Sequence, residues 1–224
     1  MVMNLDKIER EKKSLSEQQI SFSHAVTRSA HGLSLVEKRI VSLFLGKFDT
    51  RKHKKLMDRV ISIEDSTVRI TAKEYAEIFD ISDKIAYRDL IKSCDSFLGR
   101  YWSVVEETPK GKKVIKNSWL SGVKYHYGEG WVEASFSPQT IPHIVFNLKD
   151  QYTKYKLKSA MALRSAYSWR LWELLAQFAD SAESRKKRDD ERFVRISLED
   201  FIFAMEIPKS YKYSQIRQKA IEPA

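Results

Sequence analysis

VRITAKEYAEIFDISDKIAYRDLIKSCDSFL, residues 68–98, contains the pattern of a strand followed by two helices. Its first three residues alternate apolar and polar side chains, which is typical of a short strand. Thr71 then begins a Thr-x-x-Glu capping pattern, which predicts the start of a helix that ends near Phe79. Ser82 follows a tight turn and caps a longer helix, and Gly99 marks the end of that helix. Two helices joined by so short a turn indicate a helix-turn-helix unit.

The segments on either side complete the order of a winged helix. Upstream, residues 34–37 (SLVE) form a capping box, and the apolar residues after it follow helical spacing. Downstream, residues 101–107 and 114–119 are β-like and are joined by a lysine-rich turn, which predicts a hairpin. A further pair of strands flanks residues 128–130, and residues 138–148 are expected to be helical. Helix, strand, helix, turn, helix and hairpin in this order predict a winged-helix domain.

The pattern of the first strand recurs later in the chain. Residues 68–71 (VRIT) match residues 194–197 (VRIS), and the residues that follow each copy are also similar. An amphipathic helix precedes each copy, at residues 165–178 for the second, and another helix follows it, at residues 214–220. We therefore predict an α+β fold with two tandem winged-helix domains, the second of them incomplete.

The boundaries of these units follow from changes of pattern along the chain. We expect a polar N-terminal arm over residues 1–19 and a first winged-helix domain over residues 20–150. The second winged-helix domain is expected over residues 151–224, without its C-terminal part. Within it, residues 193–197 are predicted to form a strand and residues 198–205 a helix.

The composition restricts the partners and the location. Lys and Arg outnumber Asp and Glu by 40 to 30, which gives a formal net charge of +10. Such an excess favours a polyanionic partner, either nucleic acid or an anionic membrane surface. The chain has no apolar run of about 18 residues, and residues 1–13 lack the apolar core of a signal peptide. We therefore expect a cytoplasmic protein with no membrane partner. Because Cys94 is the only cysteine, an intrachain disulfide is excluded.

A row of cations lies on the second helix of the helix-turn-helix unit. Lys84, Arg88 and Lys92 recur every four residues, so the helix stacks them on one side. Such a face can lie in the major groove of DNA or on its phosphates. The alternative is an ordinary solvated helix face. The apolar stripe expected on the other side consists of Tyr87, Leu90, Ile91, Cys94, Phe97 and Leu98.

The last predicted helix and the 101–119 hairpin carry further candidate contacts. With Tyr213, Ile216 and Ala220 directed inward, the helix leaves Arg and Gln side chains outside, and these can hydrogen-bond guanine and adenine edges. The lysines at the hairpin tip are suited to phosphate contacts, as in the wing of a winged helix. We predict double-stranded DNA as the partner. The predicted DNA-binding residues are Lys84, Arg88, Lys92, Lys110, Lys112, Lys113, Lys209, Lys212, Gln215, Arg217, Gln218 and Lys219.

Catalytic arrangements are not recognisable in the sequence. The five histidines are scattered, and no two of them have the spacing of metal ligands on a helix. A phosphate-binding loop of the Gly-x-x-x-x-Gly-Lys-Ser/Thr type is missing. A nicking enzyme of the rolling-circle type needs a His-apolar-His pair and a nucleophilic tyrosine, whereas residues 125–127 (YHY) supply one histidine. We expect no enzyme activity, no metal site and no cofactor.

Three segments resemble plasmid replication initiators that bind iterons, the repeated sites of their origins. Residues 33–40 (LSLVEKRI) resemble an LSLVEQRL element near the start of such initiators. Residues 163–175 (LRSAYSWRLWELL) are similar to their SxYSxRLYELL helix. Residues 216–224 (IRQKAIEPA) look like the start of their second recognition helix. The resemblance extends from about residue 20 to the C-terminus.

The resemblance implies more than the residues alone do. It implies that monomers bind iterons, help to melt adjacent AT-rich DNA and recruit host replication proteins such as the helicase. It also implies a homodimer, formed through the first domain and about residues 101–136, that binds an inverted repeat and represses its own gene. Because the chain stops at Ala224 within the last helix, it implies a truncated second domain. The alternatives are a winged-helix transcription regulator and a metal-dependent nicking enzyme, which the missing histidine pair disfavours.

Overall fold

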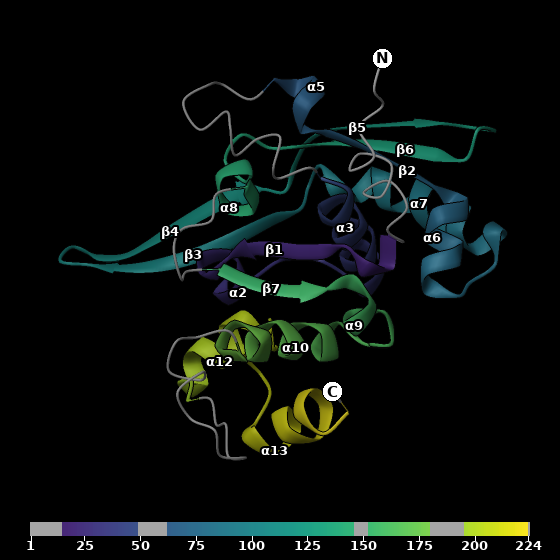
Figure 1. Ribbon diagram of the computed structural model, residues 1–224. Helices are drawn as coiled ribbons and strands as arrows, with labels where there is room; N and C mark the ends of the chain where they lie inside the picture. Colours follow the sequence, from purple (N-terminus) through teal and green to yellow (C-terminus); the bar gives the residue numbers. More distant parts are fainter. Residues whose placement is uncertain (1–14, 49–61, 146–151, 180–194, 224) are drawn as a thin grey trace.

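The computed structural model describes residues 15–48, 62–145, 152–179 and 195–223 (Figure 1). Its first core contains a helix-turn-helix unit and an antiparallel sheet whose strand order is β2-β6-β5. This is the predicted winged-helix arrangement, in which the β5–β6 hairpin is the wing. The helices are α3 (Leu35–Lys47), α6 (Ala72–Phe79) and α7 (Asp83–Phe97), and the strands are β2 (Thr67–Thr71), β5 (Leu120–His126) and β6 (Trp131–Phe136).

The caps predicted from the sequence set the helix boundaries. Capping boxes are present at Ser34, which begins α3, and at Thr71, which begins α6. Asp80 ends α6 in a left-handed conformation with φ of 50°. Ser82 accepts a hydrogen bond from a backbone N–H in the first turn of α7. The predicted apolar stripe of α7 is largely buried, but Leu98 is 57% exposed because it caps the helix beyond the last packed turn.

The predicted 101–119 hairpin exists, but it is not the wing. Its strands, β3 (Tyr101–Thr108) and β4 (Gly111–Ser118), pair with each other in a sheet of their own. The strand of the winged-helix unit, β2, pairs with β6 instead. The β3–β4 hairpin is therefore an insertion between α7 and the wing, and it extends away from the core (Figure 1). The interpretation of its tip as the wing tip was wrong.

A two-stranded ribbon joins the start of the described chain to its later part. β1 (Gln19–Ser23) pairs antiparallel with β7 (Tyr152–Lys156). Tyr155 and Leu157 are buried in the first core, although the sequence boundary assigns them to the second domain. Whether the chain divides into two folding units at residue 150 stays a prediction. The remaining short elements near this core are η1 (Leu15–Glu17), α2 (His24–Arg28), α5 (Ile63–Ser66), α8 (Ile141–Val145) and α9 (Leu157–Met161).

A smaller second core follows, built on α10 (Ala166–Ala179). Trp169 of α10 is buried in the first core, and Leu174 is buried in the second. Figure 1 shows α10 between the β1–β7 ribbon and the C-terminal helices. The other elements of this core are α12 (Leu198–Ala204), α13 (Tyr213–Ile216) and its continuation η2 (Arg217–Ile221), a π-helical turn.

Three predicted segments, at residues 193–197, 138–148 and 1–19, fall partly outside the described residues. Residues 193 and 194 of the predicted strand lie outside the described residues, and residues 195–197 form no strand. Of the predicted 138–148 helix, α8 covers the described central part. Most of the predicted polar arm, residues 1–14, also lies outside the described residues.

Candidate nucleic-acid interface

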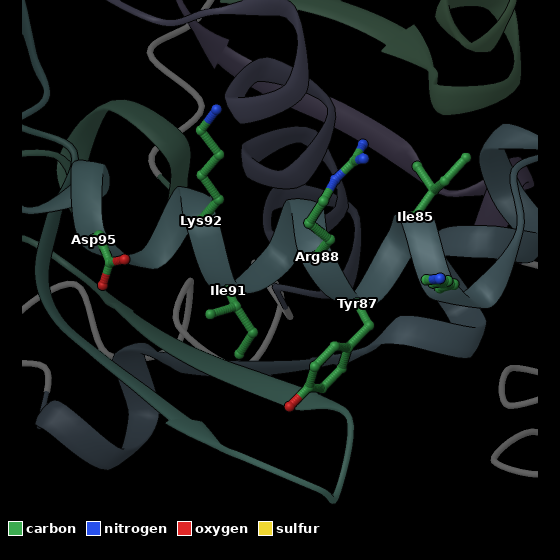
Figure 2. A pocket seen from close by; sticks show the side chains of 7 residues that line it. Ile85, Tyr87, Arg88, Ile91, Lys92 and Asp95 are labelled. Carbon is green, nitrogen blue, oxygen red and sulfur yellow. The ribbon is translucent and has the colours of Figure 1, made fainter.

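The cationic row predicted on α7 is present and exposed. Figure 2 shows Arg88 and Lys92 extending from the same side of the helix, away from Tyr87 and Ile91. Lys84 is exposed one turn before Arg88. The row borders an open hollow of about 640 Å³ along α7, which is also lined by Ile85, Tyr87, Ile91 and Asp95 of the same helix. The exposed cations can contact the phosphates of a nucleic acid, which carry the negative charge of a duplex on its outside.

Only part of this charge is offset within the helix. The Arg88 guanidinium contacts the carboxylate of the neighbouring Asp89 at 3.1 Å, but the Arg88 side chain remains 69% exposed. An exposed pair of this kind contributes little and is easily exchanged for another anion. Arg88 is therefore available to a phosphate despite its partner.

The wing is docked on α7 by a specific hydrogen bond. The backbone N–H of Gly128, at the wing tip, donates to the hydroxyl of Tyr87 on α7 over 3.2 Å. Gly128 has a φ of 92°, a conformation that L side chains rarely adopt. The contact places the wing beside the helix that carries the cationic row.

Aromatic side chains dominate the wing. Tyr127, at its tip, is 67% exposed. The guanidinium of Arg69 lies 4.2 Å from the ring centroid of Trp131 and contacts Glu133 at 2.8 Å. The sequence pattern predicts a strand pair around residues 128–130, but it does not show that β2 pairs with one of these strands and so makes this pair the wing.

The lysines at the tip of the β3–β4 hairpin face carboxylates. The ammonium of Lys112 lies 3.4 Å from the carboxylate of Glu107 and 3.3 Å from that of Glu199 on α12. The hydrogen bond to Glu199, followed by that to Glu107, raises the pKa of Lys112. Lys113 contacts Glu106 at 3.2 Å. Lys110 is exposed at the turn. Phosphate binding by Lys112 and Lys113 therefore competes with carboxylates already in place.

The last helix buries the predicted apolar positions Ile216 and Ala220, but Tyr213 is 63% exposed rather than directed inward. Gln215 is committed to a helix cap, because its side-chain oxygen accepts the backbone N–H of Lys212 over 2.9 Å. Arg217 projects outward and contacts Glu222 at 2.8 Å.

The other residues of the second core that are predicted to contact DNA lie on η2 or shortly before α13. Lys219 places its ammonium 4.8 Å from the ring centroid of Tyr211. Gln218 is exposed, as is Lys209 between α12 and α13. Arg217, Gln218 and Lys219 thus form a continuous polar surface on η2, whereas Gln215 serves the helix itself.

Within the described ranges, no group of three or more His, Cys, Asp or Glu side chains is placed to hold a metal ion. Among the helices of the same residues, none is long and apolar enough to cross a membrane.

The helix-turn-helix unit, its docked wing and the cationic face of α7 define a winged-helix protein. The family model described as Initiator Replication protein, WH1, matches residues 19–176. The chain therefore belongs to the initiator replication protein family, and the resemblance predicted from the sequence is confirmed.

Relatives and a solved structure agree with this assignment. The chain is 28% identical over 160 residues to an "Uncharacterized 27.6 kDa protein" of Escherichia coli. It is 26% identical over 161 residues to a "Replication initiation protein" of the same organism. Each match covers 71% of this chain, but only 66% of the first relative and 48% of the second.

The structure titled "Crystal structure of Pi initiator protein in complex with iteron DNA" has a similar fold. It matches with a TM-score of 0.65 and 16% identity, over 92% of this chain and 84% of the Pi chain. The predicted winged-helix fold is thereby confirmed.

Proposed function

We propose that this protein is a plasmid replication initiator that binds iterons, the repeated double-stranded sequences of an origin. The observation that carries the proposal is the exposed row of Lys84, Arg88 and Lys92 beside the wing, in a chain of the initiator replication protein family. The Pi initiator, whose fold this chain shares, was crystallised with iteron DNA, which supports the same class of ligand here.

The two cores are assigned different parts of the task. The α7 row contacts phosphates, which position the protein without reading sequence. Arg217, supported by Gln218 and Lys219, contacts base edges, because a guanidinium can donate two hydrogen bonds to guanine. Lys110, Lys112, Lys113, Lys209 and Lys212 add phosphate contacts at the edges of the interface.

Self-association through the first core is part of the proposal. Val105 and Val114 face each other across the β3–β4 hairpin and are 40% and 57% exposed. An exposed strand edge next to an apolar pair can join a second copy across a two-fold axis. As a homodimer the protein represses its own gene. As a monomer it promotes origin opening and recruits host replication proteins such as the helicase, in the cytoplasm.

The test is a pair of titrations by fluorescence anisotropy. One labelled duplex carries a candidate iteron from the DNA that flanks the reading frame, and the other carries the same bases scrambled. We expect at least about 10³-fold tighter binding to the repeats, as is typical of specific DNA recognition. Equal affinity for both duplexes would remove the iteron proposal. Protection confined to an inverted repeat at the promoter would favour a transcription regulator instead.

We propose that the initiator acts by binding and catalyses no strand cleavage. Incubation with supercoiled origin plasmid and Mg²⁺ or Mn²⁺ is expected to leave the plasmid supercoiled. Conversion of the plasmid to the open circle by the purified protein would support the nicking enzyme. As a control against a contaminating nuclease, the Lys92→Ala variant, in which DNA binding should be weaker, must then lose the cleavage activity as well.

A further inference from the structure

A single buried side chain, Arg170 on α10, contacts the backbone of both cores. Its Nη2 lies within hydrogen-bond distance of the carbonyl oxygens of Thr27 and Ser29, both at 2.8 Å. The same nitrogen is 2.9 Å from the carbonyl oxygen of Ala204, to which Nε also donates over 3.1 Å. Thr27 and Ser29 lie at the end of α2 beside the first core, and Ala204 ends α12 in the second.

The charge of Arg170 is held by a buried ion cluster. Oε2 of Glu173 accepts from Arg170 over 2.8 Å and from Lys38 of α3 over 2.6 Å. The other carboxylate oxygen accepts from the hydroxyl of Tyr155 on β7 over 2.9 Å. All four side chains are buried. Because a buried charge without its partner is strongly destabilising, the cluster holds α3, β7 and α10 in one arrangement.

His31 completes the cluster as a neutral ring. Nδ1 lies 2.7 Å from the ammonium of Lys38, which can only donate, so this nitrogen is the acceptor. Nε2 therefore carries the hydrogen and donates to the carbonyl oxygen of Val26 over 2.7 Å. Burial, together with the charges of Arg170 and Lys38, lowers the pKa of His31 well below its usual value.

A second contact from the C-terminal core reaches the same segment. The carboxylate of Glu206, just after α12, accepts the backbone N–H of His31 over 2.7 Å. It also accepts the N–H of Gly32, at 3.0 and 2.9 Å from its two oxygens. Gly32 has a φ of 62°, and a Cβ there would lie 3.3 Å from the backbone oxygen of Tyr101. Glycine at position 32 therefore allows the backbone conformation in which the N–H groups of His31 and Gly32 both point at Glu206.

Side chains of the second core therefore bind both the carbonyl and the amide groups of residues 27–32. Arg170 binds the carbonyl oxygens, and Glu206 binds the amide N–H groups. The segment is also fixed to the first core. Ala30 exchanges backbone hydrogen bonds of 3.1 and 2.9 Å with Ser103 of β3, and the indole N–H of Trp119 donates to the carbonyl oxygen of His31 over 3.0 Å.

We propose that Arg170 and Glu206 form a clamp on residues 27–32 that fixes the orientation of the second core relative to the first. The clamp makes α7 and η2 parts of one rigid body, so their cationic faces keep a constant separation. Its effect on orientation is present in the free protein and does not depend on any function of the chain in DNA binding.

The test measures a distance between the two cores in the absence of DNA. Spin labels are attached at Glu77→Cys on α6 and Ser214→Cys on α13, both exposed positions. The native Cys94 is buried and its thiol pKa is raised to about 12, so it does not compete for the label. With excess unlabelled protein added to remove distances between copies, double electron–electron resonance is expected to give one narrow distance distribution, which broadens in Glu206→Ala and in Arg170→Met.

A matched control separates the clamp from general loss of an ion pair. Lys47→Met removes the 2.6 Å contact between Lys47 and Glu74, which lies wholly within the first core, and should leave the distribution narrow. Glu206→Gln, which keeps one acceptor oxygen, should recover part of the narrow population. In Glu206→Ala, amide exchange at residues 31 and 32 should become about tenfold faster, as expected for a lost charged hydrogen bond.

Glu206 is solvent-exposed, so Glu206→Ala decides the question even if Arg170→Met does not fold. An unchanged distance distribution in folded Glu206→Ala, or equal broadening in the Lys47→Met control, would overturn the clamp.

Discussion

The hydroxyl of Tyr87 on α7 accepts a hydrogen bond of 3.2 Å from the backbone N–H of Gly128 at the wing tip. The two residues are far apart in the sequence, and the bond joins the wing to α7 of the helix-turn-helix unit. α7 also carries Arg88 and Lys92, so the position of the wing relative to these cations depends on this contact.

Removing the Tyr87 hydroxyl should loosen the wing without unfolding the core. Tyr87→Phe deletes the acceptor, and because Gly128 is exposed its N–H can turn to water. The expected loss of stability is therefore about 0.5–1.5 kcal/mol. Hydrogen exchange at the Gly128 amide should become faster. Tyr127→Phe is the control, because that exposed hydroxyl donates to the hydroxyl of Tyr125 rather than to the backbone. Unchanged exchange at Gly128 in Tyr87→Phe would contradict the docking role.

Acid should destabilise the protein through His31. Burial first, and then the charges of Arg170 and Lys38, lower the pKa of His31 in the folded chain well below 6.5. The unfolded chain binds a proton near pH 6.5 that the folded chain does not, so the free energy of unfolding decreases as the pH falls below that value. Between pH 7.5 and 5.5, this one group should lower it by at most about 1.4 kcal/mol. Urea unfolding at the two pH values measures the change.

The contribution of His31 is isolated by substitution. The pKa values of His24 and His143 are also lowered by burial, so the wild type contains contributions of the same sign from both. His31→Gln should show a smaller pH dependence than the wild type. If His31→Gln and the wild type lose the same stability on acidification, His31 does not carry the effect.

Local signals in the sequence predicted local structure well. The capping patterns at Ser34 and Thr71, and the cap at Ser82, set helix starts that the structure confirms. The spacing of Lys84, Arg88 and Lys92 placed them on one exposed side of α7. These features depend on neighbours within one turn of helix, so the sequence contains the information that determines them.

Features that depend on distant pairing were not predicted. The wing was predicted at the wrong hairpin because the sequence pattern indicates that β3 and β4 pair with each other, but it does not show that β2 pairs with β6. The sequence pattern also does not show that Tyr155 of β7 pairs with Ile20 of β1, near the other end of the chain. The Arg170 cluster was also missed. Arg170 and Glu173 fall within the predicted amphipathic helix over residues 165–178, and only the packing of both cores shows that they are buried.

The α7 row should determine part of the salt dependence of DNA binding. If Lys92 contacts a phosphate, Lys92→Ala should lower the slope of log affinity against log salt by about 0.9. Lys73→Ala removes the same charge from an exposed side chain of α6, which contacts Glu77 at 3.9 Å, and should leave the slope unchanged. Anisotropy titrations of one duplex at several salt concentrations give both slopes. Equal slopes in the two variants would mean that Lys92 contributes only to the overall charge.

Sequence readout is expected at Arg217. Its side chain is 68% exposed on η2, and its contact with Glu222 at 2.8 Å must be exchanged for a base edge on binding. Arg217→Ala should therefore cost about 1–3 kcal/mol on the iteron and relax preference at one base position. Glu222→Gln should strengthen binding, because it releases the guanidinium from a competing carboxylate.

Lys112→Ala provides the comparison for Arg217. Lys112 sits at the β3–β4 tip between Glu107 and Glu199, where it can reach phosphates but has no forked donor to match to a guanine. Its loss should weaken iteron and scrambled duplexes by the same factor, whereas Arg217→Ala should weaken the iteron selectively. The measurement is a set of titrations of both variants against iteron duplexes substituted at each position in turn. If Arg217→Ala lowers the affinity for iteron and scrambled DNA equally, base recognition lies at another residue of the second core.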